Sequence, residues 1–580
     1  MSGIAGIVNL DGAPIDRELL SRMTKFMSFR GPDGEEIWTE GNVGFGNTLL
    51  RTTPGAMLLV TDGVCITGDV RVDDWLEGDL TDAERIVRAY ETWDEACVEH
   101  LIGDFAFAIW DRRKRRLFCA RDHFGVKPFF YARVGNSFIF SNTLNVLRLD
   151  RRVSDELNET AVSDYLESGL NQDLSSTIFR DIHRLPGGHT LSIANGEITT
   201  RQYWTPAVKN EIRFRRPNEY VERFNELLSI AVKDRLPTDR VSISMSGGLD
   251  STSLAAVARD LLLSRSAVRA FTTVYDSLIP DEERHYSALA ASSLGIPIHH
   301  LNADKYALFD ERQPRDLDVA EPFLLGPFAG QFNDLLRLMT AHARVALTGY
   351  DGDALMNEPQ RSYVARTLKS LLKRKKDLQR PATIKALESK VWAPLFEGYD
   401  PGSTRLPLEV RHPFIDVRLV EYLLAIPPVP WCTGKHILRR AMKNRLPRAV
   451  LHRPKTALAG DPALQLTRRS GVRWLDNFEV TPQLTRFVNL SQRRSQAEDT
   501  PNALWANLRV FALNHWLAHS LPIDRRNGRL INGAKHGTDT RNRSATQYRP
   551  TEEALPQTRS HRLRKHSRDH PQHRIEGRSR

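Results

Sequence analysis

Short apolar runs separated by turn residues fill the first third of the chain. The runs are rich in β-branched and aromatic side chains and are bounded by Gly, Asn, Asp or Pro, which is typical of strands. They predict strands at Ile4–Leu10, Val43–Leu50, Val64–Thr67, Phe105–Asp111, Leu117–Ala120, Phe129–Ala132 and Ser137–Phe140. Helical spacing of apolar residues interrupts these runs near Arg17–Phe29 and Asp82–Glu91. The mixture predicts a layered α+β domain over residues 1–204.

The pattern changes after a connector at residues 205–216. From residue 217 onward, helix-length amphipathic stretches alternate with short apolar runs such as Val241–Met245, Ala270–Val274 and Val345–Leu347. Strands that alternate with helices favour a parallel sheet covered by helices on its faces. Residues 217–524 are therefore predicted to form a second, α/β domain.

The last residues of the chain differ in composition from the rest. The net charge is +11, but residues 525–580 alone carry 15 Lys and Arg against 5 Asp and Glu, which leaves +1 for residues 1–524. This segment is poor in large apolar residues, so we expect a disordered, solvated tail. Because the basic charge is confined to the tail, it does not indicate a nucleic-acid partner for the folded part, although the tail has the charge to contact an acidic peptide or RNA.

The composition and the first residues also indicate the cellular compartment of the protein. No apolar run reaches the ~18 residues that a membrane span needs, and the start MSGIAGIVNLDG lacks the features of a secretory signal. The four cysteines, Cys65, Cys97, Cys119 and Cys432, lie far apart without metal-binding spacing. We therefore expect a cytoplasmic protein that does not contact the membrane.

The segment VSISMSGGLDSTSLA carries the clearest chemistry. A predicted strand breaks into Ser246, Gly247, Gly248, Leu249, Asp250 and Ser251 and then into a helical pattern. Glycines allow close backbone approach to a phosphate, and the first N–H groups of a helix have no partner within the helix. The Asp250 carboxylate is explained by a Mg²⁺ ion between it and the phosphate oxygens. The pattern resembles the pyrophosphate-binding loop of ATP pyrophosphatases of the adenine-nucleotide α-hydrolase type.

Further motifs extend the resemblance over residues 1 to about 520. The segments GIAGIVNLDG, FRGPDG and FAFAIWDRRKRRLFCARDHFGVKPFFY are similar to the glutaminase domain of class II asparagine synthetases. The segments TGYDGD, VRHPFID, GKHILRRAM and HRPKT are similar to the synthetase domain of that family. The resemblance implies an N-terminal-nucleophile-hydrolase-like sandwich of two sheets between helices, followed by an ATP pyrophosphatase-like α/β domain.

Departures from the family pattern concern the glutaminase site. The family nucleophile is a cysteine directly after the initiator Met, and this chain has Ser2, which lacks a reactive thiolate. The oxyanion-hole stretch Asn-Gly-Glu appears here as Thr67, Gly68 and Asp69, while Asp82 still matches an acid that holds the glutamine amine. We therefore expect residues 1–204 to be an inactive relic of a glutaminase.

The resemblance also implies roles in the ligase domain. Asp250 and Asp353 would carry Mg²⁺, Thr348 and Gly349 would contact the nucleotide, and Met245 and Thr273 fall at adenine-side positions. Lys455 matches the family lysine that stabilises charge during adenylation and amide formation.

The identity of the base that deprotonates the attacking amine stays open between two candidates. Tyr350 falls where asparagine synthetases have a glutamate and β-lactam-forming members have a tyrosine, and Glu409 is a candidate to assist it. Asp351 is the competing candidate.

A synthetase without its own ammonia supply needs another amine. The stretch His412–Pro462, with IPPVPWC, KHILR and RPKTALAGDP, looks most like the lasso-peptide cyclases, in which a peptide N-terminus attacks an adenylated Asp or Glu side chain. The expected partners are a precursor peptide and the protease that removes its leader.

Four other functions stay open. Within the enzyme class these are an asparagine synthase that uses ammonia or glutamine and a β-lactam-type small-molecule synthetase. A tRNA-modifying ATP pyrophosphatase would explain only SGGLDS and the basic tail. A non-catalytic scaffold would leave Asp250, Asp353 and Lys455 unexplained.

Overall fold

The structure is a computed structural model. It describes residues 1–520 apart from 53–57, 74–79, 238, 263, 265–266, 310–318, 323–325, 351, 359–379, 455–459, 471–478 and 490–500, together with 523–524 and 529–530. Its contacts divide the chain into residues 1–533 and 534–580. The predicted site residues Asp351 and Lys455, and most of the predicted tail, lie outside the described residues.

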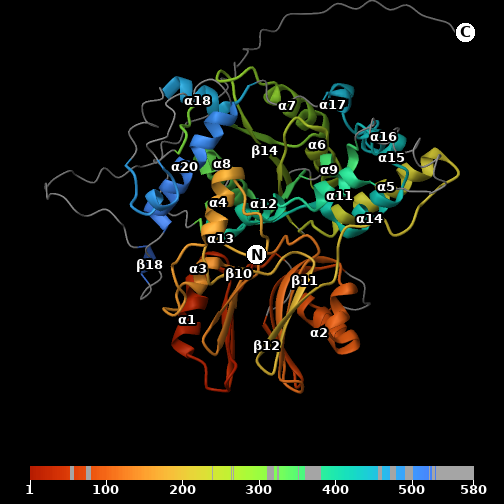
Figure 1. Cartoon of the computed structure of the whole chain (residues 1–580). Coiled ribbons are helices and arrows are strands. Elements are labelled where there is room, and N and C mark those ends of the chain that lie inside the picture. Colours follow the sequence, from red (N-terminus) through yellow and green to blue (C-terminus); the bar gives the residue numbers. More distant parts are fainter. Residues whose placement is uncertain are drawn as a thin grey trace, which may run out of the picture. The chain divides into compact units, whose positions relative to one another are not determined.

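Two six-stranded antiparallel sheets face each other in the N-terminal part (Figure 1). The first has the order β10 (His183–Arg184), β8 (Phe130–Val134), β9 (Ser137–Ser141), β1 (Gly3–Asn9), β3 (Val43–Thr48) and β2 (Glu35–Glu40). The second has the order β12 (Glu197–Gln202), β11 (His189–Ala194), β7 (Arg116–Arg121), β6 (Gly103–Asp111), β5 (Val64–Val72) and β4 (Leu58–Val60). Phe45 and Phe140 of the first sheet pack with Trp110 and Cys119 of the second to form the core between them.

Helices cover the outer faces of both sheets. The first sheet packs against α1 (Arg17–Phe26), α3 (Leu144–Leu147) and α4 (Glu159–Ser168), and the second against α2 (Asp82–Trp93). Because both faces are covered, every residue of the central strand β6 is buried. The predicted layered α+β sandwich is therefore confirmed.

The C-terminal part is built on a parallel sheet. Its order is β15 (Ile298–Asn302), β14 (Val268–Val274), β13 (Val241–Ser244), β16 (Val345–Thr348) and β17 (Glu409–Arg411). The longer helices around it are α5 (Pro217–Lys233), α6 (Leu249–Leu261), α7 (Glu283–Leu294), α8 (Ala329–His342) and α14 (Val417–Ala425). The short ones are α9 (Gly352–Met356), α11 (Pro381–Leu387), α12 (Trp392–Tyr399), α13 (Pro401–Thr404), α15 (Pro428–Trp431), α16 (His436–Ala441), α17 (Arg448–His452) and α18 (Pro462–Ser470). The predicted α/β arrangement is confirmed.

The chain returns to the N-terminal part at its end. Helix α20 (Pro501–Ser520) packs beside α4 on the outer face of the first sheet, and Trp516 lies 5.9 Å from the Phe179 ring. Leu513 and Leu517 belong to the same buried cluster as Met23 of α1. The two predicted regions therefore share a hydrophobic core.

Two sequence expectations differ from the structure. Strands β2, β4, β10, β11 and β12 were not predicted. Of these, β2 and β12 are edge strands with mostly exposed side chains and lack an apolar run, β4 and β10 have only three and two residues, and β11 is largely buried but was missed. Residues 529–530 lie in the predicted disordered tail, yet β19 (Arg529–Leu530) pairs with β18 (Ile523–Asp524). None of the helices in the described residues is long and apolar enough to cross a membrane.

Candidate active site

The SGGLDS loop lies at a switch point of the parallel sheet. The chain leaves β13 toward β14 on one side, whereas β16 pairs with β13 on the other side. Ligands of open α/β sheets bind at the carboxyl ends of the strands at such a point. Residues 245–248 follow β13, and Gly349 and Tyr350 follow β16, so the two predicted nucleotide-binding motifs leave neighbouring strands at this edge.

Two glycines allow these loops to touch. A Cβ atom on Gly349 would lie 2.7 Å from the backbone nitrogen of Ser251, and one on Gly352 would lie 2.6 Å from the Asp250 carboxyl carbon. Such distances are below any ordinary contact, so the glycines are required by the close approach of the two loops. They bring Asp250, at the first turn of α6, next to the start of α9.

The loop after β13 is held by its own hydroxyl groups. Ser246 Oγ accepts from the Gly248 N–H at 3.1 Å and lies 3.1 Å from Ser251 Oγ. Helix α6 begins directly after Gly248 and runs for 13 residues. Its dipole adds partial positive charge at this end, which favours an anion there. Binding of a phosphate by the loop stays a prediction.

The predicted nucleotide contacts lie around the same strand ends. The Met245 N–H donates to the Phe271 carbonyl at 2.9 Å, which places Met245 beside β14, the strand that carries Thr273. Thr348 Oγ1 lies 2.9 Å from Nδ1 of His412. Burial lowers the pKa of His412 to about 3, so its imidazole is neutral near pH 7 and orients the Thr348 hydroxyl.

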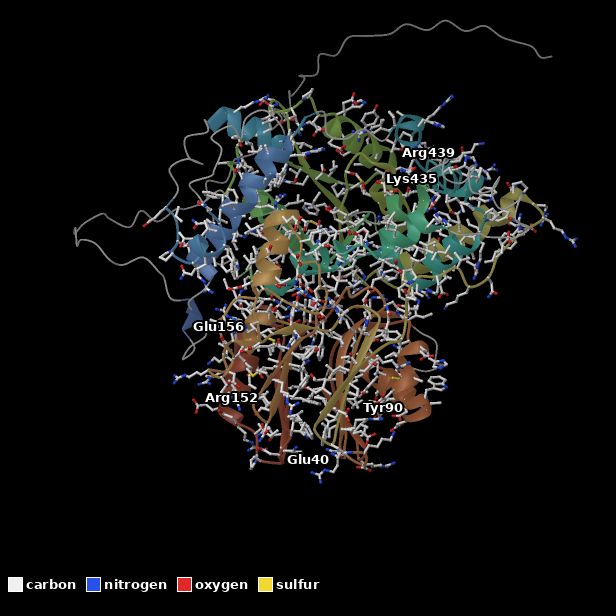
Figure 2. The ribbon with its side chains drawn as sticks, in the orientation of Figure 1. Glu40, Tyr90, Arg152, Glu156, Lys435 and Arg439 are labelled. Atoms are coloured by element: carbon white, nitrogen blue, oxygen red, sulfur yellow. The ribbon has the colours of Figure 1, made fainter. Side chains whose placement is uncertain are left out.

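Lys435, which is labelled in Figure 2, pairs with both predicted metal ligands. Its Nζ lies 2.5 Å from Asp250 Oδ2 and 2.8 Å from Asp353 Oδ1. Two carboxylates from the first turns of α6 and α9 thus converge on one positive charge. Mg²⁺ in nucleotide sites is commonly held by one or two carboxylates together with phosphate oxygens. No three His, Cys, Asp or Glu side chains of the described residues are grouped to hold a metal by themselves.

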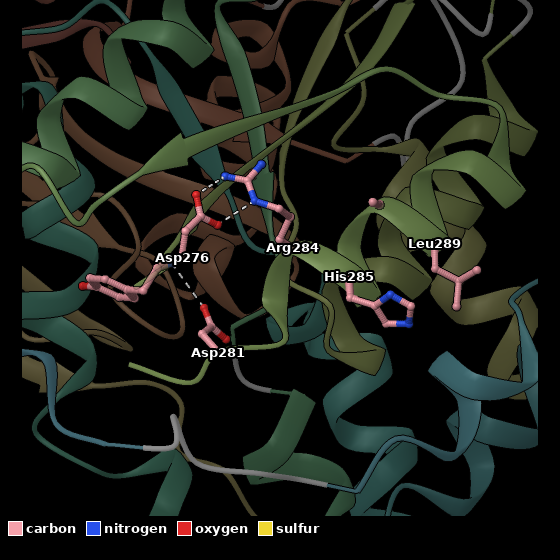
Figure 3. A pocket seen from close by; sticks show the side chains of 7 residues that line it. Asp276, Asp281, Arg284, His285 and Leu289 are labelled. Carbon is pink, nitrogen blue, oxygen red and sulfur yellow. Dashed lines mark hydrogen bonds and ion pairs between the residues drawn. The ribbon is translucent and has the colours of Figure 1, made fainter. Parts of the chain in front are cut away.

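A second ion pair lies against the SGGLDS loop. Glu283, the first residue of α7, accepts the Gly247 N–H at 2.5 Å and pairs with Arg453 at 3.0 Å. An open pocket lies around the same turn of α7 (Figure 3). It is lined by Tyr275, Asp276, Asp281, Arg284, His285, Ala288 and Leu289.

Lys435, Glu283 and Arg453 are site residues that the sequence interpretation missed. Lys435 and Arg453 are basic residues inside the motifs GKHILRRAM and HRPKT, which was an available signal. Glu283 has no such signal, because its contact with Gly247 joins residues that are 36 positions apart.

The two predicted proton-transfer residues that the structure describes are not brought together. Tyr350 is 39% exposed and its Oη accepts a hydrogen bond from Tyr399 at 3.0 Å. Glu409 is buried and binds Lys127 at 2.9 Å and Arg411 at 3.0 Å. Burial opposes ionisation of Glu409, but these cations outweigh it and hold the pKa well below its usual range. Glu409 is therefore part of a buried cluster of ion pairs with Lys127 and Arg411. The described residues show no contact between Glu409 and Tyr350.

The predicted glutaminase residues surround Ser2 only in part. The Ser2 N–H donates to Asp69 at 3.1 Å, and Ser2 Oγ accepts from the Leu50 N–H at 3.3 Å. Thr67 and Gly68, which precede Asp69 on β5, lie against the Asn47 amide. Among the described residues, the Ser2 hydroxyl has no hydrogen bond to a basic side chain, and its inactivity as a nucleophile stays a prediction.

Asp82 stands apart from this group. It lies at the first position of α2, where its carboxylate pairs with Arg85 at 3.3 Å. The structure shows no hydrogen bond or ion pair between Asp82 and Ser2 among the described residues. Its predicted role as a ligand of a glutamine amine therefore stays a prediction.

Comparison with known proteins agrees with these two parts. Residues 78–204 match the glutamine amidotransferase domain family, and residues 223–398 and 395–518 match the asparagine synthase family. Asparagine synthetase [glutamine-hydrolyzing] 3 of Bacillus subtilis strain 168 is 26% identical over 535 residues, which cover 79% of this chain and 86% of that protein. Asparagine synthetase [glutamine-hydrolyzing] 2 of the same strain is 27% identical over 544 residues, covering 78% and 71%.

Among solved structures, a glutamine phosphoribosylpyrophosphate amidotransferase from B. subtilis aligns with 51% of this chain and 65% of its own at 12% identity and a TM-score of 0.26, which is too low to support an argument. The asparagine synthase match spans just over half of the chain. The chain belongs to the asparagine synthase family of ATP-dependent carbon–nitrogen ligases.

Proposed function

We propose that this protein is an ATP- and Mg²⁺-dependent amide ligase that closes a macrolactam in a ribosomally made peptide. A side-chain carboxylate of the peptide attacks the α-phosphorus of ATP, and pyrophosphate leaves. The N-terminal amine then attacks the adenylated carbonyl, so that an amide forms and AMP leaves. The partners in this proposal are a precursor peptide and a protease that exposes its N-terminus.

The observation that carries the proposal is the contrast between the two sites. At the ligase site, anion-binding donors, two convergent carboxylates and two cations lie at the end of the parallel sheet. At the N-terminal site, Ser2 replaces the thiol nucleophile, and its hydroxyl oxygen accepts a hydrogen bond from the Leu50 N–H. A ligase that does not release ammonia from glutamine has to take its amine from free ammonia or from the substrate itself, and we favour the substrate.

Charge stabilisation is the main task of the ligase residues. Asp250 and Asp353 would hold Mg²⁺, which supplies positive charge to the departing pyrophosphate when it is bound. The Ser246–Ser251 loop would bind the pyrophosphate through backbone N–H groups. Lys435 is placed to contact either the carboxylates or the phosphates, because its Nζ lies between the two loops. Lys455 would act on the reacting carbonyl, but it lies outside the described residues.

The tyrosine pair is the candidate path for the amine proton. The Tyr399 hydroxyl is buried, which raises its pKa well above the usual value, and it therefore stays a donor near neutral pH. It donates to Tyr350 Oη, and the Tyr350 side chain is partly exposed to solvent. Tyr350 is thus oriented by Tyr399. Asp351 remains the competing proton acceptor.

The test uses the full chain with ATP, Mg²⁺ and a synthetic core peptide that has a free N-terminus. We expect AMP release together with a peptide that has lost one water, and neither product from the Asp250→Asn variant. An amide cannot replace an anionic Mg²⁺ ligand. Formation of AMP without any change in the peptide would contradict the cyclase assignment.

Asparagine synthesis is the second candidate, because the chain covers 86% and 71% of two asparagine synthetases. The same assay with aspartate and either ammonia or glutamine separates the two functions. Asparagine formation with ammonia alone would identify an ammonia-dependent synthase, and glutamate release from glutamine would show that the Ser2 site is active. A β-lactam-type product from a small amino acid substrate is the third possibility that this assay reveals.

A further inference from the structure

We propose that Glu283 is a built-in competitor of pyrophosphate, whose carboxylate takes the same donors that the phosphate needs. This inference rests on the proposed role of the Ser246–Ser251 loop in binding the pyrophosphate of ATP. On this view, polyphosphate binding moves two donors from Glu283 to phosphate oxygens, and Glu283 takes them back when pyrophosphate leaves.

The two oxygens of the Glu283 carboxylate bind different parts of the site. Oε2 accepts the backbone N–H of Gly247, inside the glycine-rich loop, at 2.5 Å. Oε1 pairs with Arg453 Nη2 at 3.0 Å. Both side chains are largely buried, with 19% of Glu283 and 10% of Arg453 exposed. Hydrogen bonds to ionised groups are about twice as strong as neutral ones, so both donors are firmly engaged.

A phosphate would use the same two donors. Loop N–H groups and a guanidinium fork are the groups that proteins present to phosphate oxygens. A carboxylate and a phosphate cannot occupy the two donors together. Each N–H group points toward one acceptor position, and two anions at that position would repel each other. Binding of pyrophosphate therefore requires that the Glu283 side chain moves aside.

The surroundings hold Arg453 in place when Glu283 moves. The Arg453 guanidinium lies 4.3 Å from the centre of the Tyr286 ring, one turn along α7. A Cβ atom on Gly247 would lie 2.6 Å from Arg453 Nη1 and 2.5 Å from Tyr286 Cβ, so the loop backbone packs directly against both. Arg453 thus keeps its position beside the loop through the aromatic ring.

Glu283 can leave without disturbing the helix. Asp281 Oδ1 accepts the Glu283 N–H at 2.9 Å and so anchors its backbone independently of its side chain. A carboxylate at the first position of a helix is also favoured by the helix dipole in more than one rotamer. The exchange therefore needs only a side-chain rotation at the start of α7.

The consequence concerns the release of product. A ligand that must displace an internal competitor binds only the fraction of the protein in which the site is open. Its apparent dissociation constant equals the intrinsic constant divided by that fraction. Glu283 is therefore expected to weaken pyrophosphate binding and to speed its departure. If Glu283 merely supported the loop, its removal would weaken pyrophosphate binding instead, so the sign of the effect separates the two roles.

The experiment measures the dissociation constant of inorganic pyrophosphate by calorimetry with the full chain. The variant Glu283→Gln keeps an oxygen for Gly247 but loses the charge that pairs with Arg453. We expect its Kd to fall about tenfold, which corresponds to about 1.4 kcal/mol. The matched control Glu282→Gln removes the same charge one residue away, where the side chain is exposed, and its Kd should stay within about twofold of the unaltered chain.

Three results decide the matter. Tighter binding by Glu283→Gln and not by Glu282→Gln supports the competitor role. Unchanged or weaker binding by Glu283→Gln overturns it and leaves the ligase proposal standing. No pyrophosphate binding by either the unaltered chain or Glu283→Gln overturns both. If Glu283→Gln does not fold, Glu283→Asp replaces it, since the shorter carboxylate cannot reach both donors and is also expected to lower the Kd.

Discussion

Asp82 is an acidic residue in an environment that disfavours its charge. It is 5% exposed at the start of α2, and burial raises its pKa to about 6, although Arg71 and Arg85 act in the opposite direction. In an unfolded chain the same carboxyl titrates near 3.8. Folding therefore favours the protonated form, so this group stabilises the fold fully below pH 3.8 and loses that contribution as the pH rises through about 6.

The variant Asp82→Asn should remove this pH dependence. At pH 7.5 we expect it to raise the free energy of unfolding by about 1–3 kcal/mol, because one pKa unit corresponds to about 1.4 kcal/mol. At pH 4 the difference should be close to zero. Denaturant unfolding at the two pH values checks this. A variant that is less stable than the unaltered chain at pH 7.5 would show that the ionised Asp82 makes a favourable contact.

Glu84, in the same helix turn, provides a control, because its pKa is shifted in the opposite direction from that of Asp82. Its carboxylate accepts the Thr81 backbone N–H at 2.7 Å and completes a capping box. These hydrogen bonds lower its pKa. Glu84→Gln should therefore lower stability at pH 7.5, whereas Asp82→Asn raises it.

Site residues were predictable where a local motif carries them. Asp250 and Ser251 follow two glycines at the start of a helix, and this pattern indicates an anion-binding site. The structure places both residues at a switch point of the sheet. The pairing of Lys435 with Asp250 joins residues that are 185 positions apart and follows only from the fold. The predicted partnership of Tyr350 and Glu409 failed to appear in the described residues because Lys127 and Arg411 hold Glu409 elsewhere.

At the scale of elements, the strands predicted in the sandwich are mostly buried ones, although the largely buried β11 was missed. Strands β1, β3 and β6 are buried along nearly their whole length, which requires the apolar runs that predict them. The edge strand β12 has mostly exposed residues, and its pairing with β11 depends on backbone hydrogen bonds that leave no hydrophobic pattern. The packing of α20 on the N-terminal part is a long-range contact and has no local signature.

The turn after β16 depends on close contact with the start of α6. Gly349→Ala would place a Cβ atom 2.7 Å from the Ser251 nitrogen and 2.8 Å from its Cα, and these are backbone atoms that cannot rotate away. We expect a loss of about 1–3 kcal/mol in the free energy of unfolding and a weaker affinity for ATP. Thermal unfolding and ATP titration measure the two effects.

Gly34→Ala is the matched control for this turn. Its Cβ atom would meet only Leu49 Cβ at 3.8 Å, an ordinary contact. We expect stability within about 0.5 kcal/mol of the unaltered chain. If Gly349→Ala behaved like this control, the two loops would not need their close approach.

At the scale of the whole molecule, buried ion pairs connect the N-terminal sandwich to the ligase part. Arg235 of the ligase part binds Asp104 of the sandwich at 3.2 Å, and Lys127 of the sandwich binds Glu409 at 2.9 Å. Burial and the cations Arg235 and Arg71 act in opposite directions on Asp104, and the cations win, so its pKa falls to about 2. Because the two parts also share a hydrophobic core through α20, they are expected to unfold together.

Arg30 tests this coupling. Its guanidinium is fully buried and bidentate to Asp400 of the ligase part, with one contact at 2.8 Å, and it also reaches Asp69 at 3.6 Å. Arg30→Met leaves two carboxylates buried beside an apolar side chain. Breaking a buried pair from one side costs about 3–5 kcal/mol. We therefore expect the single unfolding transition to move down as a whole, without splitting into two.

A surface pair gives the matched comparison for Arg30. Arg486 and Glu159 also join the two parts, at 3.4 Å, but 63% and 70% of their side chains are exposed. Water screens such a pair, so Arg486→Met should change stability by less than about 0.5 kcal/mol. In a double-mutant cycle, Arg30→Met combined with Asp400→Leu should be less damaging than the sum of the single changes, because the second change removes one of the stranded charges. Additive effects, or two separate transitions by calorimetry, would show that the sandwich and the ligase part are energetically independent and that the buried ions merely lie at their boundary.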